Sequence, residues 1–482
     1  MMTVWMFAPL VVPLLGAIAY AVLGWRPATA WAGAASAGLV LAAAIGAAVE
    51  VVGAGEHTAA AGVLRADALT AFLLVVVGAV ALLATAATPA HLAAEVEAGR
   101  ATERTARWHC AAVQLFLASA VLAVLAADLG LLWVAIEAAV LVTGFLVGQG
   151  AGRAGAEAAW KLVVICSAGL ALALLGIVLL DHAGSDVDGV RIAVVLLVVG
   201  FGTMAGLAPL HAWVPDAHGQ APAPVAALLS GVLLPVAAYA MLRVKAVADV
   251  VLGPTFGRVL LAALAVVSLL VAASLLLAQR DYQRMLAYSS TGQLGLVALG
   301  AAIGGPLALA AALLHLLGHG LAKAVLFLGA GRIRQLTGTS RTDGVRGLAA
   351  RHPMLAAAVG AGVLALLGLP PFSLFASGLG IARAGFAAGL GWLVAIALVG
   401  VLVIAVALIA HTSRMLLGDP PDSPGAATAG QPLPASTTAT LLGGLVVCAA
   451  LGVAAEPLAT LLRLAADTLV GTPVTGTLVG AP

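Results

Sequence analysis

The chain has 482 residues, of which 63% are hydrophobic and 9% charged, and its formal net charge is +2. A soluble protein of this length could not cover so much apolar surface, so the composition predicts an all-α protein that crosses a membrane many times. The near-neutral charge and the absence of a long Lys/Arg run in the sequence give no support to nucleic-acid binding. Partners are therefore expected among lipid and other membrane proteins.

Apolar segments of about 20 residues, the length that crosses a bilayer as a helix, recur along the chain. We predict about 14 transmembrane helices from this pattern. The predicted spans are 4–24, 29–53, 66–87, 108–126, 129–149, 158–180, 191–210, 222–244, 256–279, 285–303, 306–330, 354–384, 390–416 and 437–462. The first span has no basic segment before it, so we expect a retained helix and not a cleaved signal.

Hydrophilic loops interrupt this pattern at 88–107, 332–352 and 418–437, and none fits a separate soluble domain. Loops that follow odd-numbered spans hold about twice as many Arg and Lys residues as the loops between them. The positive-inside rule then predicts that the odd-numbered loops face the cytoplasm. With an even number of spans, both termini lie on the outer side of a bacterial-type inner membrane.

Three cysteines are isolated within or beside apolar segments, Cys110, Cys166 and Cys448. Without a CxxC or Cys/His cluster they are interpreted as small buried apolar residues. No metal or cofactor site is expected. Haem would need axial ligands from opposite sides, whereas His315 and His319 share one face of one helix. No nucleophile–base set or nucleotide loop is present in the sequence, so this chain alone is expected to be a non-catalytic subunit.

Ionisable residues inside the apolar spans are the first candidates for function, because a charge at the helix centre costs about 2.5 to 3.5 kcal/mol on insertion scales. Glu137 lies well inside the predicted span 129–149. It is either a neutral carboxyl bonded to a neighbouring helix or part of an ion path, and we favour the path. Lys161 follows Glu157 by four residues, which predicts an interfacial pair on one helix face; pairing with Glu137 instead would suit proton transfer.

His315, His319 and Lys323 are spaced by four residues in a later span. This spacing places the three side chains on one face over about 12 Å of helix. A single buried histidine is usually structural, but three titratable groups on one face favour a proton wire.

The segment 201–243 is an apolar span interrupted by Pro209 and by a polar turn with His211, Asp216 and His218. Bilayer lipid cannot satisfy the backbone groups that such a break frees, so breaks persist where protein or water receives them. These polar residues either cap a helix and hold the turn, or form a gate for water. The sequence favours neither interpretation over the other. A second break is predicted at Pro370 and Pro371, where an inverted repeat would place it.

Several motifs together resemble the proton-conducting, antiporter-like membrane subunits shared by respiratory complex I, Mrp-type cation/proton antiporters and membrane-bound hydrogenases. The motifs are LLWVAIEA around Glu137, EAAWKLVVICS around Lys161, AGLAPLHAWVPDAH, RDYQRMLAYSS, HLLGHGLAKAVLFLGAG and LGLPPFSLFASG. The hydrogenase-4 component F branch is the most similar.

The resemblance implies a fold of fourteen helices with two inverted five-helix repeats, assembled beside other membrane subunits of a redox-driven ion pump. We divide the chain accordingly into N-terminal helices (1–107), a first repeat (108–246), a second repeat (256–416), and a polar loop with a last helix (417–482).

The resemblance also implies an ion path. Of the charged residues that form this path in the family or in its hydrogenase-like branch, the resemblance matches Glu137, Lys161 and Lys323. The candidate proton or cation pathway comprises Glu137, Lys161, His211, Asp216, His218, His315, His319 and Lys323.

Departures from the family pattern put conduction in question. Met204 and Pro235 stand where the family usually carries lysines, Gly378 where it carries a charged residue, and Gln293 in a region where histidine is common. A relay needs titratable partners, and Met, Pro and Gly offer none. Two hypotheses follow: a subunit that moves protons or another small cation, and a degenerate subunit that serves as a scaffold.

Overall fold

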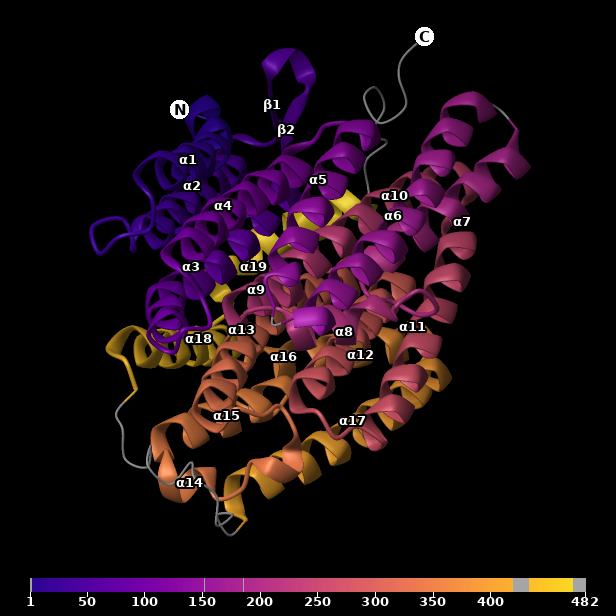
Figure 1. Ribbon diagram of the computed structural model, residues 1–482. Helices are drawn as coiled ribbons and strands as arrows, with labels where there is room; N and C mark the ends of the chain where they lie inside the picture. Colours follow the sequence, from indigo (N-terminus) through magenta and orange to yellow (C-terminus); the bar gives the residue numbers. More distant parts are fainter. Residues whose placement is uncertain (1, 151, 185, 419–432, 471–482) are drawn as a thin grey trace.

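The computed structural model describes residues 2–150, 152–184, 186–418 and 433–470, and nearly all of the secondary structure in these ranges is helical (Figure 1). In the first half the elements are α1 (Met2–Leu23), α2 (Ala32–Ala54), β1 (His57–Ala59), η1 (Ala60–Gly62), β2 (Leu64–Ala66), α3 (Ala68–Glu97), α4 (Glu103–Leu125), α5 (Leu129–Gly148), α6 (Gly152–Ala183), α7 (Val187–Met204), α8 (Trp213–Gln220), α9 (Ala223–Leu228), η2 (Leu229–Leu233) and α10 (Leu234–Leu252). In the second half they are α11 (Pro254–Leu277), α12 (Tyr282–Ile303), α13 (Gly305–Thr337), η3 (Thr342–Gly344), α14 (Leu348–Arg351), α15 (Pro353–Leu366), α16 (Ser373–Ala387), α17 (Gly391–Leu417), α18 (Ala435–Val453) and α19 (Glu456–Val470).

Within these ranges, 13 helices are long and apolar enough to cross a membrane, with α9, η2 and α10 counted as one span. The predicted span 354–384 is instead two shorter helices, α15 and α16, so the prediction of about fourteen crossings agrees with 13 spans and one broken helix. The predicted span 437–462 is wrong in its boundaries, because α18 ends at Val453 and a separate amphipathic helix, α19, begins at Glu456. Most of the predicted polar loop 418–437 lies outside the described residues.

The centre of the bundle is formed by α13 and by the α9–α10 span, whose apolar windows are fully buried. Around α13 pack α3, α9, α12, α15, α16, α18 and α19. The peripheral helices expose apolar faces, with examples in Val22, Val164 and Leu402. Exposed apolar side chains on long apolar helices are typical of surfaces that face lipid or a neighbouring membrane helix.

Loops that follow odd-numbered spans meet at one end of the bundle. Asp281 and Arg341 form an isolated β-bridge between two of them, and Gln335 of α13 donates a hydrogen bond to Glu95 of α3 at 2.8 Å. At the other end, Leu64 bridges Ala126. The loops therefore alternate between ends as the sequence predicts, while the assignment of the Arg-rich end to the cytoplasm stays a prediction.

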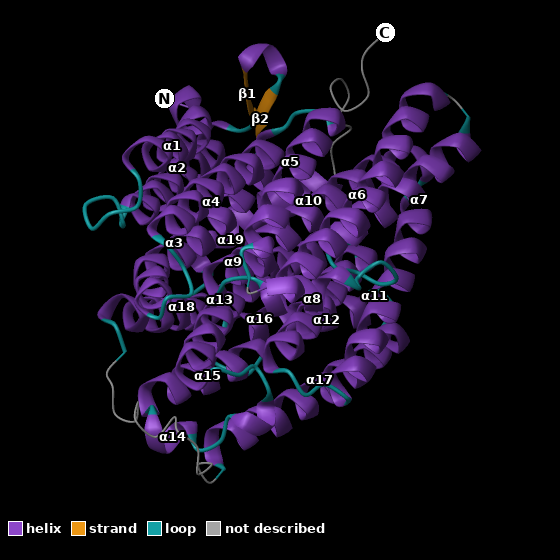
Figure 2. Ribbon diagram, in the orientation of Figure 1, coloured by secondary structure: helices purple, strands orange, loops and turns teal. Residues whose placement is uncertain are grey.

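A β-hairpin, which the sequence pattern did not indicate, projects at one edge of the molecule, with α14 at the opposite edge (Figure 2). Its strands β1 and β2 are antiparallel, and His57 pairs with Ala66. The turn is tight: Ala60 and Ala61 have φ of 53° and 57°.

Directly after β2, Asp67 begins α3 by accepting a hydrogen bond from the Thr70 backbone N–H at 2.8 Å. The same carboxylate lies 2.6 Å from Arg243 and 3.6 Å from Arg65, and all three side chains are almost fully buried. Burial alone would raise the pKa of Asp67, but the charges of Arg243 and Arg65 outweigh it and hold that pKa below its usual value. This ion cluster fastens the hairpin to the middle of α10.

Both helix breaks are satisfied by polar side chains from neighbouring helices. Between α7 and α8, the backbone N–H of Ala208 donates to Ser268 Oγ of α11 at 3.0 Å, next to Pro209. Between α15 and α16, the carbonyl of Leu366 accepts from Gln293 Nε2 of α12 at 2.9 Å. The peptide bonds preceding Pro209 and Pro371 are cis, and Pro370 precedes Pro371 directly. Protein groups thus replace the water that a broken helix needs in lipid.

Candidate functional site

A buried polar face runs along α13, the central helix. His315 is 2% exposed, and His319 and Lys323 are fully buried. All three point away from the apolar surface of the bundle, and their spacing covers about 12 Å of helix. Serines of α12 and of the short η2 segment lie against this face.

His315 is held at both ring nitrogens. Its Nδ1 lies 2.9 Å from Ser377 Oγ of α16, and its Nε2 lies 2.7 Å from Gln293 Oε1 of α12. Gln293 is also the residue that satisfies Leu366 at the second break. Gln293 lies in a region where the family commonly has histidine. In this structure it links His315 to the freed backbone carbonyl of Leu366.

His319 has looser contacts. Its Nε2 lies 3.5 Å from Ser230 Oγ in the π-helical η2 segment, and Ser230 is 3.0 Å from Ser290 of α12. Its Nδ1 is buried and has no hydrogen-bond partner among the described atoms. A π-helical turn moves a side chain out of ordinary helical register and is common at functional sites.

Lys323 is buried with only neutral partners. Its Nζ donates to Ser289 Oγ at 2.5 Å and to the Leu286 carbonyl of α12. No ion pair in the described ranges includes Lys323. Because an ammonium without a counter-ion is costly to desolvate, Lys323 is suited to exchange its proton with water or a neighbouring base.

His218 of α8 brings the first break to the same face. Its Nδ1 lies 2.7 Å from the Val214 carbonyl, and its Nε2 has no partner among the described atoms. The imidazole packs 5.2 Å from the ring of Phe327, and Lys323 Nζ lies 5.8 Å from the centre of that same ring. The helix α8 is fixed by Trp213, which donates to the Thr203 carbonyl at 2.9 Å.

The other polar residues of the break belong to a separate cluster. Asp216 forms ion pairs with Lys161 at 3.0 Å and with Arg284 at 2.7 Å, and it does not cap a helix. Lys161 also pairs with Glu157 at 2.7 Å, as the four-residue spacing predicted. Its ionic partners in the structure are thus Glu157 and Asp216. His211 is half-buried, and its Nδ1 lies 3.2 Å from the Pro209 carbonyl.

Glu137 lies on α5 and accepts a hydrogen bond from Ser167 Oγ of α6 at 2.7 Å. Its second carboxyl oxygen is buried and has no partner among the described atoms. Ser167 comes six residues after Lys161 on α6, which corresponds to about 9 Å of rise. The structure therefore gives Glu137 a hydroxyl partner and one unsatisfied oxygen.

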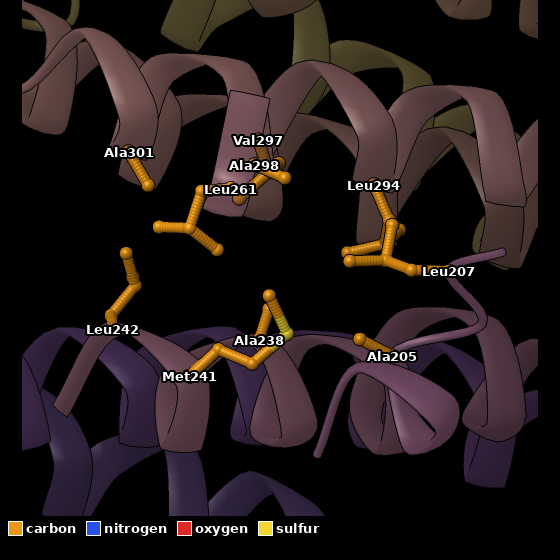
Figure 3. Close-up of a pocket in the computed structure, with 10 residues that line it drawn as sticks. All are labelled: Ala205, Leu207, Ala238, Met241, Leu242, Leu261, Leu294, Val297, Ala298 and Ala301. Carbon is orange, nitrogen blue, oxygen red and sulfur yellow. The ribbon is translucent and has the colours of Figure 1, made fainter. Parts of the chain in front are cut away.

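An apolar pocket lies beside the first helix break (Figure 3). Its walls include residues that come shortly after Met204 and Pro235 in the chain. Its ten lining residues are all aliphatic or Met: Ala205, Leu207, Ala238, Met241, Leu242, Leu261, Leu294, Val297, Ala298 and Ala301. Figure 3 shows these side chains meeting across the gap between facing helices. Nothing that lines this pocket can carry a proton.

Gly378 is different. An added Cβ at this position would meet no atom within 4 Å, and the residue follows Ser377, the partner of His315. The space for a longer side chain is therefore present where the sequence departs from the family pattern.

Sequence reasoning singled out the titratable residues and missed the neutral ones that connect them. Ser230, Ser289 and Ser290 were not proposed, and Ser377 was overlooked as the partner of His315. The polar run SSTGQ within a predicted apolar span is a signal that could have pointed to α12. Its Ser289, Ser290 and Thr291 are fully buried.

A family of membrane proteins described as NADH:quinone oxidoreductase/Mrp antiporter matches residues 126–404. The chain belongs to this family. It is 35% identical to the hydrogenase-4 component F homolog of Methylacidiphilum infernorum over 352 residues, which cover 68% of this chain and 74% of the relative. It is 37% identical to NADH-quinone oxidoreductase subunit N of Desulforudis audaxviator over 260 residues, covering 51% of this chain and 52% of the relative. The resemblance drawn from the motifs is confirmed.

Solved structures agree on the fold. A chain of the Mrp complex from Dietzia sp. matches with a TM-score of 0.85 and 23% identity over 97% of both chains. A chain of respiratory complex I from Thermus thermophilus matches with a TM-score of 0.74 and 24% identity, covering 95% of this chain and 99% of that one. Both neighbours are subunits of multi-subunit membrane complexes. The inverted repeat stays a prediction.

Proposed function

We propose that this antiporter-like subunit conducts protons across the membrane within a complex I-like or hydrogenase-like assembly, with the redox chemistry carried out by partner subunits. Family membership supports ion translocation as the general activity. The observation that carries the proposal is the buried polar face of α13, where Lys323 has no counter-ion among the described residues and His319 keeps one free ring nitrogen.

The proposed path runs from His218 to Lys323, then to His319 and His315. His218 and Lys323 both lie against the Phe327 ring and have no direct hydrogen bond to each other among the described atoms, so the proposed step between them requires a bridging water. Between Lys323, His319 and His315 the hydroxyls of Ser289 and Ser230 and the amide of Gln293 face the titratable groups. Hydroxyls both donate and accept hydrogen bonds, which is what a proton wire requires between basic sites.

Glu137, Lys161, Asp216 and His211 form the other part of the proposed pathway. Glu137 has one free carboxyl oxygen, whereas Lys161 and Asp216 are held by ion pairs. We assign Glu137 a proton-binding role and the Lys161–Asp216–Arg284 group an electrostatic one, since paired charges at the break attract water.

The test is proton flux in the complex reconstituted into vesicles, with a potential imposed and an internal pH dye as readout. Glu137→Gln and His319→Ala are compared with the unaltered complex and with Val22→Ala, a change on the exposed apolar face of α1. Flux that falls in both pathway variants and persists in the control supports conduction. Unchanged flux in both variants contradicts it.

A scaffold is the second candidate, because the apolar pocket occupies the region after Met204 and Pro235 and the position of Gly378 has no charge. In that case the assembled complex would pump through a sister subunit. Removal of this chain would then abolish assembly, while every point change on the α13 polar face would leave flux intact.

For localisation we propose a bacterial-type inner membrane with both termini on the outer side. Reporter fusions that are active only outside or only inside the membrane test this orientation. A cytoplasmic signal from a fusion at the N-terminus would reverse it.

A further inference from the structure

A polar cavity lies at the Arg-rich end of the bundle. It has a volume of about 420 Å³, room for several water molecules. Its walls come from the end of α3, the start of α4, the end of α5, the junction of α8 and α9, and the last turns of α13. The α3 and α4 residues precede residue 126, so they lie outside the segment that matches the family.

His109 of α4 lines this cavity and is only 1% exposed. Its Nδ1 lies 2.8 Å from Gln149 Oε1 of α5, while its Nε2 has no partner among the described atoms. A buried ring nitrogen without a protein partner in a polar cavity points to water at that position.

A fixed carboxylate lies in the same wall. Glu95 accepts hydrogen bonds from Arg100 at 2.7 Å and 2.9 Å and from Gln335 at 2.8 Å. Gln335 Nε2 also lies 3.1 Å from His91 Nδ1. Because Arg100 and Gln335 hold both of its oxygens, this carboxylate is suited to be a fixed negative charge in the cavity wall and not to shuttle protons itself.

The cavity shares two of its walls with helices of the proposed path, α8 and α13. Gln220 and Ala221 line it, and His218 lies two residues before Gln220 on the same helix. On α13, Gly331 lines the cavity and Phe327, the ring against His218, comes four residues earlier, about 6 Å along the helix.

We propose that this cavity is the water-filled entrance through which protons reach His218, with His109 as the first proton-binding group and Glu95, held by Arg100, as a fixed negative charge in the cavity wall. A proton from water binds His109 Nε2 and leaves to the next water toward His218 Nε2. The inference rests on the proposed conduction but assigns residues of the N-terminal helices to it.

Water access is tested first, in a complex whose native cysteines are replaced. Ala221→Cys places a thiol in the cavity wall, and Ala226→Cys is the matched control, buried in α9 but outside the cavity. A charged, membrane-impermeant methanethiosulfonate added from the Arg-rich side should modify Ala221→Cys and leave Ala226→Cys unmodified. Equal protection of both thiols, with an exposed loop thiol outside the cavity at Ala98→Cys modified, would overturn the entrance.

Flux is tested next. His109→Phe should lower proton flux by about tenfold or more, because a proton-binding step is lost, and Cys110→Ala, the next residue of α4, should leave flux unchanged. Glu95→Gln should lower proton flux less than His109→Phe does. If the unaltered complex shows no flux, the proposed conduction and this inference both fail. If the unaltered complex conducts and His109→Phe conducts equally well, the entrance alone is wrong.

Discussion

Replacing Lys323 by Met tests whether a buried amine serves conduction or structure. The two side chains are similar in length, and the site is fully buried. Removing the ammonium relieves a cost of about 2.5 to 3.5 kcal/mol on insertion scales. It also removes two hydrogen bonds, and bonds to a charged group contribute about 1.5 to 3 kcal/mol each.

The structure reduces the free energy lost with these two hydrogen bonds. The Leu286 carbonyl also accepts from Ser289 at 2.8 Å and from Ser290 at 3.3 Å, so it keeps partners when the lysine is gone. We therefore expect Lys323→Met to lower the free energy of unfolding by no more than about 2 kcal/mol. Proton flux, in contrast, should fall by about tenfold or more, since no titratable group is left between His218 and His319.

The control is Lys245→Met, another buried lysine. Lys245 pairs with Asp249 at the far end of α10, away from the proposed path, so its loss should destabilise the protein and leave flux per folded complex unchanged. Thermal unfolding in detergent and dye-monitored flux in vesicles are measured on the same preparations. Full flux in Lys323→Met would refute the reasoning, as would a loss of flux that merely parallels the loss of stability in both variants.

Two further changes probe other parts of the structure. Gly378→Glu should fold, because an added Cβ there meets no atom within 4 Å, and should leave proton flux unchanged, because adjacent residues of a helix do not share a face and position 378 opens away from the buried His315–Ser377 pair; a raised flux would show instead that position 378 borders the path. Asp67→Asn should lower the free energy of unfolding by about 3 to 5 kcal/mol, because Arg65 and Arg243 are left buried without a counter-ion. Since the pKa of Asp67 is depressed in the folded state, its stabilisation is present at neutral pH and is lost only as the pH falls through that lowered value. Thermal unfolding from pH 7 downward measures this, and equal midpoints for both proteins at neutral pH would contradict it.

Sequence predicted the fold well because long apolar segments leave few alternatives in a bilayer. The breaks at Pro209 and at Pro370–Pro371 were visible as prolines in apolar spans, and the titratable groups on the polar face of α13 were visible through their four-residue spacing. The hairpin was missed because Ala60 and Ala61 adopt left-handed backbone conformations that alanine composition does not signal.

The connections within the site were harder to predict, because they depend on packing between helices far apart in the chain. Spacing alone gave the Glu157–Lys161 pair, which is local, whereas the Asp216–Arg284 pair joins separate helices. Neutral groups such as Gln293 gain significance only through the neighbours that the fold brings to them.

The most direct measurement is a high-resolution map of the assembled complex that resolves ordered water around α13. The account predicts water within hydrogen-bonding distance of His218 Nε2 and His319 Nδ1, two buried ring nitrogens of the proposed path that lack partners among the described atoms. A continuous file of such water past Lys323 would support a conducting subunit. Apolar side chains sealing both nitrogens from any water would contradict it.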